Sequence, residues 1–266
     1  MTNKTNYTIL LPPSEGKNEN SNSDKYSIVK QNNLFNYFSD LDTLRYRISS
    51  NLQDSINKSD ELKTEKILDL KGKNLQKAIN VTLNLENEKT ISAINRYSGV
   101  MFKSINYSNM SDIQKENFNN SVIFIDGMFG LLKPQDLIPD YKLKITSKFG
   151  KFNITKFWKE YLYSKFNDLF SQTQLVIDIL PGAHRKVVNF SNAQNYVEIM
   201  FAKIDEKTNK LKNVGHESKV LKGEIINFIT QSDTISLDNL KTWKHSSGYS
   251  YSPENSNKHL LVYLKN

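Results

Sequence analysis

Polar side chains follow several apolar, strand-like runs of this chain, and their types suit acid–base or anion-binding chemistry. Ser14 and Glu15 come shortly after one such run, and Asp126 ends another. A carboxylate can serve as a general base, and a histidine such as His216 can act as an electrophile. Because loops at strand ends commonly carry function, we expect a site there. The candidate catalytic residues are Asp126, His216, Ser14 and Glu15.

Each of these patterns also has a simpler interpretation without chemistry. The stretch 12–17, PPSEGK, lacks the upstream glycine of a Walker loop, so it can be an ordinary polar strand end. The stretch 122–145 can be a buried strand, an Asp-Gly turn and a second strand. His216, Lys219 and Lys222 share one face if their segment is helical, and that face suits either an anionic ligand or solvent.

A short turn, Arg96-Tyr97-Ser98-Gly99, separates two helical patterns within residues 91–105. Two helices joined in this way can present backbone N–H groups to a phosphate. Arg96 would add charge, and Tyr97 would offer a ring on which a base can stack. The alternative is a plain helix end with Gly99 in a left-handed conformation.

The composition favours a globular protein and allows, without proving, a nucleic-acid partner. The chain has 266 residues, with 36 Lys+Arg against 28 Asp+Glu and a formal charge of +8. A basic surface attracts phosphates, although a nucleotide bias in the gene would also enrich lysine. No run of 18 or more apolar residues is present, and the first residues do not form a signal peptide, so we expect a cytoplasmic protein without membrane contact.

No cofactor or metal site is expected from the sequence. The chain has no cysteine, which excludes disulfides, thiolate metal sites and cysteine nucleophiles. Its four histidines show no HxxxH, HxH or ExxH spacing. An iron-binding buffer assembled from distant carboxylates is therefore the least favoured function.

Apolar runs alternate with helical patterns along the whole chain. An apolar pattern at helical spacing extends from Leu34 to Ile56, and residues 142–145 alternate like a strand. Another buried run ends at Pro181, where His184 and two basic residues follow. The strands are predicted at 7–11, 122–125, 175–180, 196–203 and 260–264. This order predicts a single compact domain over 1–266, of class α/β (α+β), with a mixed β-sheet wrapped by helices.

Five motifs in order resemble the YaaA family of peroxide-stress proteins, and together they span nearly the whole chain. They are the stretches 11–17 (LPPSEGK), 96–99 (RYSG), 126–141 (DGMFGLLKPQDLIPDY), 156–158 (KFW) and 248–249 (GY). The third motif is the most specific of the five.

The resemblance implies a fold with a positively charged cleft and a helix-hairpin-helix element at about 75–120. It also implies a cytosolic DNA-binding protein of the response to hydrogen peroxide, which limits iron-dependent oxidative damage to DNA. The partner would be double-stranded or distorted DNA, with no obligate protein partner. The expected nucleic-acid-binding residues are Lys17, Arg96, Tyr97, Gly99, Lys103, Lys133, Lys142, Lys186, Lys219 and Lys222.

The alternative function is an enzyme that acts on a damaged base or nucleotide in the same basic cleft. Three departures from the family pattern affect ligand geometry more than the fold. Asp140 is inserted before Tyr141, the stretch 181–184 replaces an Asn/Ser-rich turn, and Lys222 stands where the family has arginine. Lysine keeps the charge at that position but loses the planar fork of arginine.

Overall fold

The five strands predicted from apolar runs all form, and they lie side by side and parallel in one sheet. They are β1 (Tyr7–Leu11), β3 (Val122–Asp126), β8 (Leu175–Asp178), β9 (Tyr196–Ile204) and β12 (Leu260–Lys265). Three antiparallel strands, β4 (Gly130–Leu132), β10 (Leu211–Asn213) and β11 (Tyr249–Tyr251), make the sheet mixed. The computed structural model describes residues 5–21, 23–27 and 38–265. It is one mixed α/β domain, as predicted.

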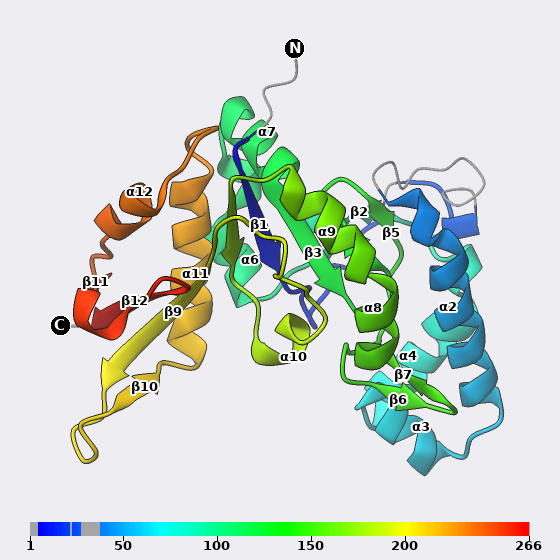
Figure 1. The fold of residues 1–266 in the computed structure, drawn as a ribbon. Helices are drawn as coiled ribbons and strands as arrows, with labels where there is room; N and C mark the ends of the chain where they lie inside the picture. Colours follow the sequence, from blue (N-terminus) through cyan, green and yellow to red (C-terminus); the bar gives the residue numbers. More distant parts are fainter. Residues whose placement is uncertain (1–4, 22, 28–37, 266) are drawn as a thin grey trace.

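The order of the strands is β11-β12-β9-β8-β1-β3-β4, with β10 paired to β9 (Figure 1). Every residue of β1, β3 and β8 is buried. Parallel strands covered on both faces need apolar side chains on both sides, which explains why these strands appeared as continuous apolar runs.

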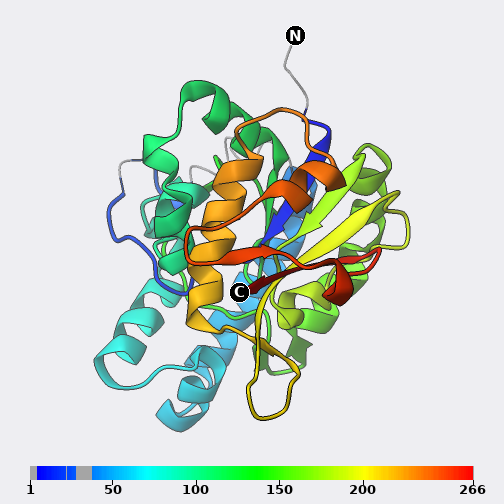
Figure 2. The same cartoon turned by 90° about the vertical axis from the view of Figure 1, so that its left-hand side faces the viewer.

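Helices cover both faces of this sheet. Figure 2 shows α8 (Ile154–Tyr161) and α9 (Tyr163–Ser171) on one side, and α6 (Val100–Ile105), α7 (Asp112–Ser121) and α11 (His216–Ile229) on the other. The remaining helices are α2 (Asp42–Asn57), α3 (Glu61–Leu68), α4 (Gly72–Leu83), α5 (Ala93–Arg96), α10 (Gly182–Arg185) and α12 (Leu237–Thr242). Two small pairs, β2 (Ile91–Ser92) with β5 (Leu137–Ile138) and β6 (Lys148–Phe149) with β7 (Phe152–Asn153), complete the fold.

The sheet has a switch point between β1 and β8. The chain leaves β1 for β3 on one side of the sheet, and leaves β8 for β9 on the other. Ligands of parallel α/β sheets bind beyond the carboxyl ends of the strands at such a point, because the loops diverge there and leave a crevice. The stretches that follow Leu11 and Asp178 therefore lie where the fold favours a site.

The alternative interpretation of residues 142–145 as a second strand is wrong. The segment is irregular and pairs with no strand, although Leu143 and Ile145 are buried and Lys142 and Lys144 are only part-buried. Its apolar and polar residues alternate because the segment is extended and lies against the core on one face. It therefore has the sequence pattern of a strand although it forms no ladder of hydrogen bonds.

The helical pattern is confirmed only in part. Residues 34–37 of the pattern that begins at Leu34 lie outside the described residues, and α2 begins at Asp42. Region 75–120 contains most of α4 and α7 and all of β2, α5 and α6, and its helix-hairpin-helix character stays a prediction. The left-handed alternative for Gly99 is wrong, because its φ is −71°. Among the described residues, no helix is both long and apolar enough to span a bilayer.

Candidate functional site

A cavity of about 250 Å³ opens at the switch point of the sheet. Pro13, Ser14 and Glu15 from the stretch after β1 form one wall. Pro181 and His184, which follow β8, form a second wall, and the irregular segment 141–146 forms the third. These three stretches are remote in the sequence. They meet because the strands that end beside them, β1, β8 and β3, are neighbours in the sheet.

Gly127 determines how closely the segment 141–146 can approach the sheet. A Cβ atom at this position would lie 2.8 Å from the carbonyl oxygen of Leu143 and 2.9 Å from the amide nitrogen of Ile145. Real Cβ atoms essentially never come so close to backbone. The Asp-Gly sequence at the end of β3 therefore serves two purposes, since the glycine admits the cavity wall and the acid anchors it.

Asp126 is fully buried, and four donors surround its carboxylate. Oδ1 accepts hydrogen bonds from the amides of Met128 at 2.7 Å and Phe129 at 3.0 Å. Oδ2 accepts from the hydroxyl of Tyr97 at 3.0 Å and from that of Tyr141. The two hydroxyl oxygens are themselves 3.2 Å apart. We call this group of three side chains, Tyr97, Asp126 and Tyr141, the carboxylate–phenol cluster.

The two phenols of this cluster remain protonated donors at neutral pH. Burial raises the pKa of Tyr97 well above 10.0, and the negative charge of Asp126 raises it further. The same two causes raise the pKa of Tyr141. The ring of Tyr97 packs against Phe102 and Phe124 in the core, so it offers no exposed face on which a base could stack.

Lys17 joins the carboxylate–phenol cluster to the cavity. Its Nζ lies 4.0 Å from the centroid of the Tyr141 ring and 3.3 Å from the carbonyl oxygen of Ser14, to which it donates. It lines both this cavity and a second one of about 190 Å³ that extends toward α4. Burial lowers the pKa of Lys17 to about 8, although the charges of Asp126 and Asp140 oppose this shift.

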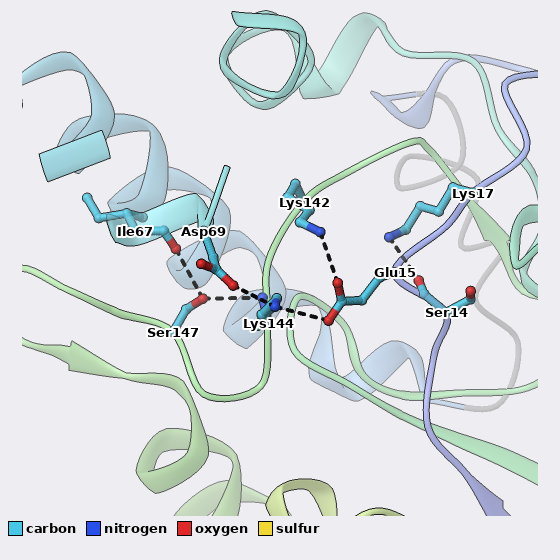
Figure 3. A network of polar contacts seen from close by, with 8 residues as sticks. All are labelled: Ser14, Glu15, Lys17, Ile67, Asp69, Lys142, Lys144 and Ser147. Atoms are coloured by element: carbon cyan, nitrogen blue, oxygen red, sulfur yellow. Dashed lines mark hydrogen bonds and ion pairs between the residues drawn. The ribbon is translucent and has the colours of Figure 1, made fainter. Parts of the chain in front are cut away.

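Glu15 lies between two lysines of the segment 141–146 at the cavity (Figure 3). Its carboxylate is 3.0 Å from Nζ of Lys144 and 3.6 Å from Nζ of Lys142. Lys144 also contacts Asp69 at 2.7 Å. Partial burial would raise the pKa of Glu15, but the hydrogen bond from Lys144 and the charge of Lys142 outweigh it and lower the pKa. The Glu15 side chain itself is 68% exposed.

The wall that follows β8 contains an imidazole nitrogen without a partner. Nδ1 of His184 is buried and forms no hydrogen bond among the described residues. Burial lowers the pKa of His184 to about 4, against the opposing charges of Asp126 and Glu15. The imidazole that lines the cavity is therefore neutral at neutral pH.

Arg185, next to His184 on α10, fixes this wall to the sheet. Its guanidinium contacts Asp178 at 2.5 Å and Glu198 at 2.6 Å, and donates to the carbonyl oxygen of Leu180 at 3.0 Å. Burial raises the pKa of Asp178, and this contact with Arg185 opposes that shift. These ion pairs hold the short helix against the ends of β8 and β9.

The structure places six of the predicted site residues at or beneath the cavity. Ser14, Glu15, Lys17 and Lys142 line it, and Asp126 and Tyr97 lie beneath it in the carboxylate–phenol cluster. Gly99 packs directly against the Ser14 side chain, and a Cβ there would displace the serine hydroxyl.

Other predicted residues lie apart from the cavity lining or in the interior. Arg96 is buried, and its guanidinium donates to backbone carbonyls, including Asn18 at 2.5 Å and Lys89 at 3.0 Å. Nζ of Lys133 donates to the carbonyl oxygen of Asn120 at 2.6 Å. These two side chains hold the loops together. The side chains that are exposed elsewhere are Lys103, Lys186, His216 and Lys219.

Lys222 has an intermediate position. Its Nζ donates to the carbonyl oxygen of Ile179 at 3.0 Å, beside the wall that follows β8. The helix α11 does include His216, Lys219 and Lys222, as the spacing suggested. Gly223 packs α11 closely against α6, because a Cβ there would lie 2.6 Å from the carbonyl oxygen of Met101.

Sequence reasoning missed Tyr141 and Lys144 as site residues. Both belong to the segment 141–146, whose alternating pattern was attributed to a strand. The Pro-Asp-Tyr end of the most specific motif was the available signal for Tyr141. No group of three or more histidine and acidic side chains suited to a metal ion occurs among the residues that the structure describes.

Comparison with known proteins identifies relatives over most of the chain. The family model for the peroxide stress protein YaaA matches residues 7–255. The UPF0246 protein MYPE6270 of Malacoplasma penetrans is 30% identical over 234 residues, which cover 86% of this chain and 87% of that protein. A UPF0246 protein of Rickettsia felis is 26% identical over 181 residues, or 67% of this chain and 72% of that protein. The chain therefore belongs to the peroxide stress protein YaaA family.

Proposed function

We propose that this chain is a cytoplasmic DNA-binding protein of the response to hydrogen peroxide, which limits iron-dependent oxidative damage to DNA. Family membership supports the peroxide response, and the formal charge of +8 favours contact with phosphates. The observation that carries the proposal is the cavity at the switch point. Lys17, Lys142 and Lys144 line it beside apolar walls, and this combination suits a nucleotide.

The proposed DNA-binding lysines fall into two groups, one exposed on the surface and one part-buried at the cavity. Lys103, Lys186 and Lys219 are exposed, and none of them has an ion-pair partner among the described residues, so they are suited to hold phosphates. Lys17 and Lys142 would meet an unpaired nucleotide that enters the cavity. We assign no direct DNA contact to the other predicted residues.

The test is duplex binding as a function of salt. Each phosphate contact contributes about −0.9 to the slope of log K against log[salt]. Lys186→Ala and Lys219→Ala should each lower the magnitude of that slope by about 0.9 and weaken binding for every sequence. Lys58→Ala is the control, because Lys58, which caps the C-terminus of α2, is 78% exposed and pairs with Asp54. A flat salt dependence for the unmodified protein would exclude the proposal.

A second candidate function is an enzyme that acts on a damaged base or nucleotide. The carboxylate–phenol cluster beneath Lys17 favours it, because it places a buried carboxylate and two protonated phenols near the cavity. Incubation with duplexes that carry an oxidised base or an abasic site tests this function. Absence of base release and strand scission, with the wild type and Asp126→Asn equally inert, would remove it.

A further inference from the structure

The amine of Lys17 has an unusual environment for a lysine that faces a cavity. It lies over the ring of Tyr141 and donates to one backbone carbonyl, yet no carboxylate lies within ion-pair distance among the described residues. A lysine that only stabilises the fold would normally pair with an acid when it is withdrawn from water. An amine held without a counter-ion in a part-buried site is the arrangement used by imine-forming lysines.

We infer that Nζ of Lys17 is a nucleophile that forms a reversible imine with the aldehyde of a phosphorylated sugar held in the cavity. The shared chemistry is an aldehyde carbon at one end of a sugar that also carries a phosphate ester. It has two sources, an abasic site in DNA and a free sugar phosphate such as deoxyribose 5-phosphate. The choice of DNA as the source rests on the proposed function, whereas the imine chemistry does not.

Three features around the amine support this assignment. Burial lowers the pKa of Lys17 to about 8, so a sizeable fraction is neutral and nucleophilic near physiological pH. Lys142 and Arg96 also disfavour its charged form, while Asp126 and Asp140 favour it. Tyr141, beneath the amine, is bonded to Asp126 and can relay a proton to the carbonyl oxygen.

The phosphate has a place beside Lys142 and Lys144, which line the same cavity. Lys142 and Lys144 both contact the Glu15 carboxylate, which is 68% exposed (Figure 3). A phosphate oxygen can replace this carboxylate on the two lysines, and Glu15 would then turn into solvent without leaving a buried charge unpaired. In this arrangement Glu15 occupies the anion site until the sugar phosphate enters.

The reaction balances without an oxidant, reductant or metal. The nitrogen lone pair attacks the aldehyde carbon while the C=O π electrons move to oxygen, and a proton passes from nitrogen to that oxygen to give a carbinolamine. A proton then converts the hydroxyl into water, which leaves as the nitrogen lone pair forms the C=N bond, and the nitrogen gives up its second proton in return. The net products are the imine and one water molecule, and hydrolysis reverses both steps.

Reductive trapping tests the inference with the full-length protein. Sodium cyanoborohydride would be added with deoxyribose 5-phosphate, with a duplex containing an abasic site, or with the intact duplex. The expected result is one adduct per chain, mapped by peptide mass to Lys17 at least tenfold faster than to exposed lysines such as Lys58. The intact duplex should give none. Modification spread evenly over surface lysines, or absent at Lys17, would overturn the inference.

Two variants and a pH series separate chemistry from folding. Lys17→Arg keeps the charge but cannot form the imine, so it should lose the adduct while its unfolding transition stays close to that of the wild type. Lys58→Arg should trap normally. The trapping rate should rise with a midpoint near pH 8, and a midpoint above pH 10 would contradict the role of Lys17.

The outcomes also distinguish this inference from the proposed function. Tight, salt-dependent duplex binding without any adduct would leave the DNA-binding proposal intact and refute the imine. An adduct with deoxyribose 5-phosphate in a protein that does not bind duplex would support the imine and refute the DNA proposal. An adduct with abasic DNA as well as the free sugar phosphate would support both.

Discussion

Removing the two phenol hydroxyls of the carboxylate–phenol cluster should destabilise the fold more than the sum of the two single changes. Tyr97→Phe and Tyr141→Phe each leave the ring in place and delete one donor to Oδ2 of Asp126. In either single variant this oxygen keeps the other phenol as a donor. In the double variant Oδ2 has none of its protein donors left, while Oδ1 keeps the amides of Met128 and Phe129.

The magnitude follows from the charge and the complete burial of Asp126. A hydrogen bond to a charged group contributes about 1.5–3 kcal/mol to stability, so each single variant should lose an amount in this range. A buried acceptor that loses its last donor costs a further 1–3 kcal/mol or so, and more when it carries charge. The double variant should therefore exceed the sum of the singles by about 1 kcal/mol or more.

Urea unfolding of the four proteins in this double-mutant cycle measures the coupling. The midpoints should fall while the m-value stays constant, because the surface exposed on unfolding does not change. Tyr163→Phe is the control, since Tyr163 is 53% exposed and should change stability by less than about 0.5 kcal/mol. Additivity of Tyr97→Phe and Tyr141→Phe within about 0.5 kcal/mol would show that the two phenols do not share one carboxylate oxygen.

Two further predictions concern the residues around the site. Gly130→Ala should lower the free energy of unfolding by about 2–5 kcal/mol, because φ at Gly130 is +72° and the new Cβ would lie 2.7 Å from the Trp158 ring. Gly182→Ala is the control, because no atom lies within 4 Å of the Cβ added there. Equal unfolding midpoints for the two variants would refute the argument. His184 has its pKa lowered from 6.5 to about 4, so between these values the unfolded chain binds more protons and stability falls as the pH falls. The difference in unfolding free energy between wild type and His184→Gln, measured from pH 4 to 7.5, should vary in this window, and a flat difference would contradict the burial of the His184 ring nitrogen.

The central strands could be predicted because their burial is recorded in the residue types of the strands themselves. Strands such as β1 and β3 are buried on both faces and therefore appear as continuous apolar runs. The caps of α3 and α7 are equally local, because the side-chain oxygens of Asp60 and Ser111 accept from free amides of the first turn that follows them. Gly127 was visible as part of an Asp-Gly turn, but not as the gap that admits the segment 143–145.

The site could be predicted only in part because its partners are set by tertiary contacts. Arg96 and Lys133 have the residue types of phosphate ligands, yet both serve backbone carbonyls within the fold. Nothing local distinguishes such a cation from one that faces solvent. Tyr141 was missed for a different reason. It belongs to an extended segment on the core surface, and such a segment has the same two-residue period as a strand.

The position of β1 at the centre of the sheet has a consequence for biosynthesis. The strand leaves the ribosome before both of its partners, which are β3, beginning at Val122, and β8, beginning at Leu175. At about 5–20 residues per second, an apolar segment with two unpaired edges persists for several seconds on the growing chain. Contacts between residues so far apart in sequence also form slowly. We therefore expect chaperone dependence in newly made chains, and release of an insoluble product from translation stopped before Asp178.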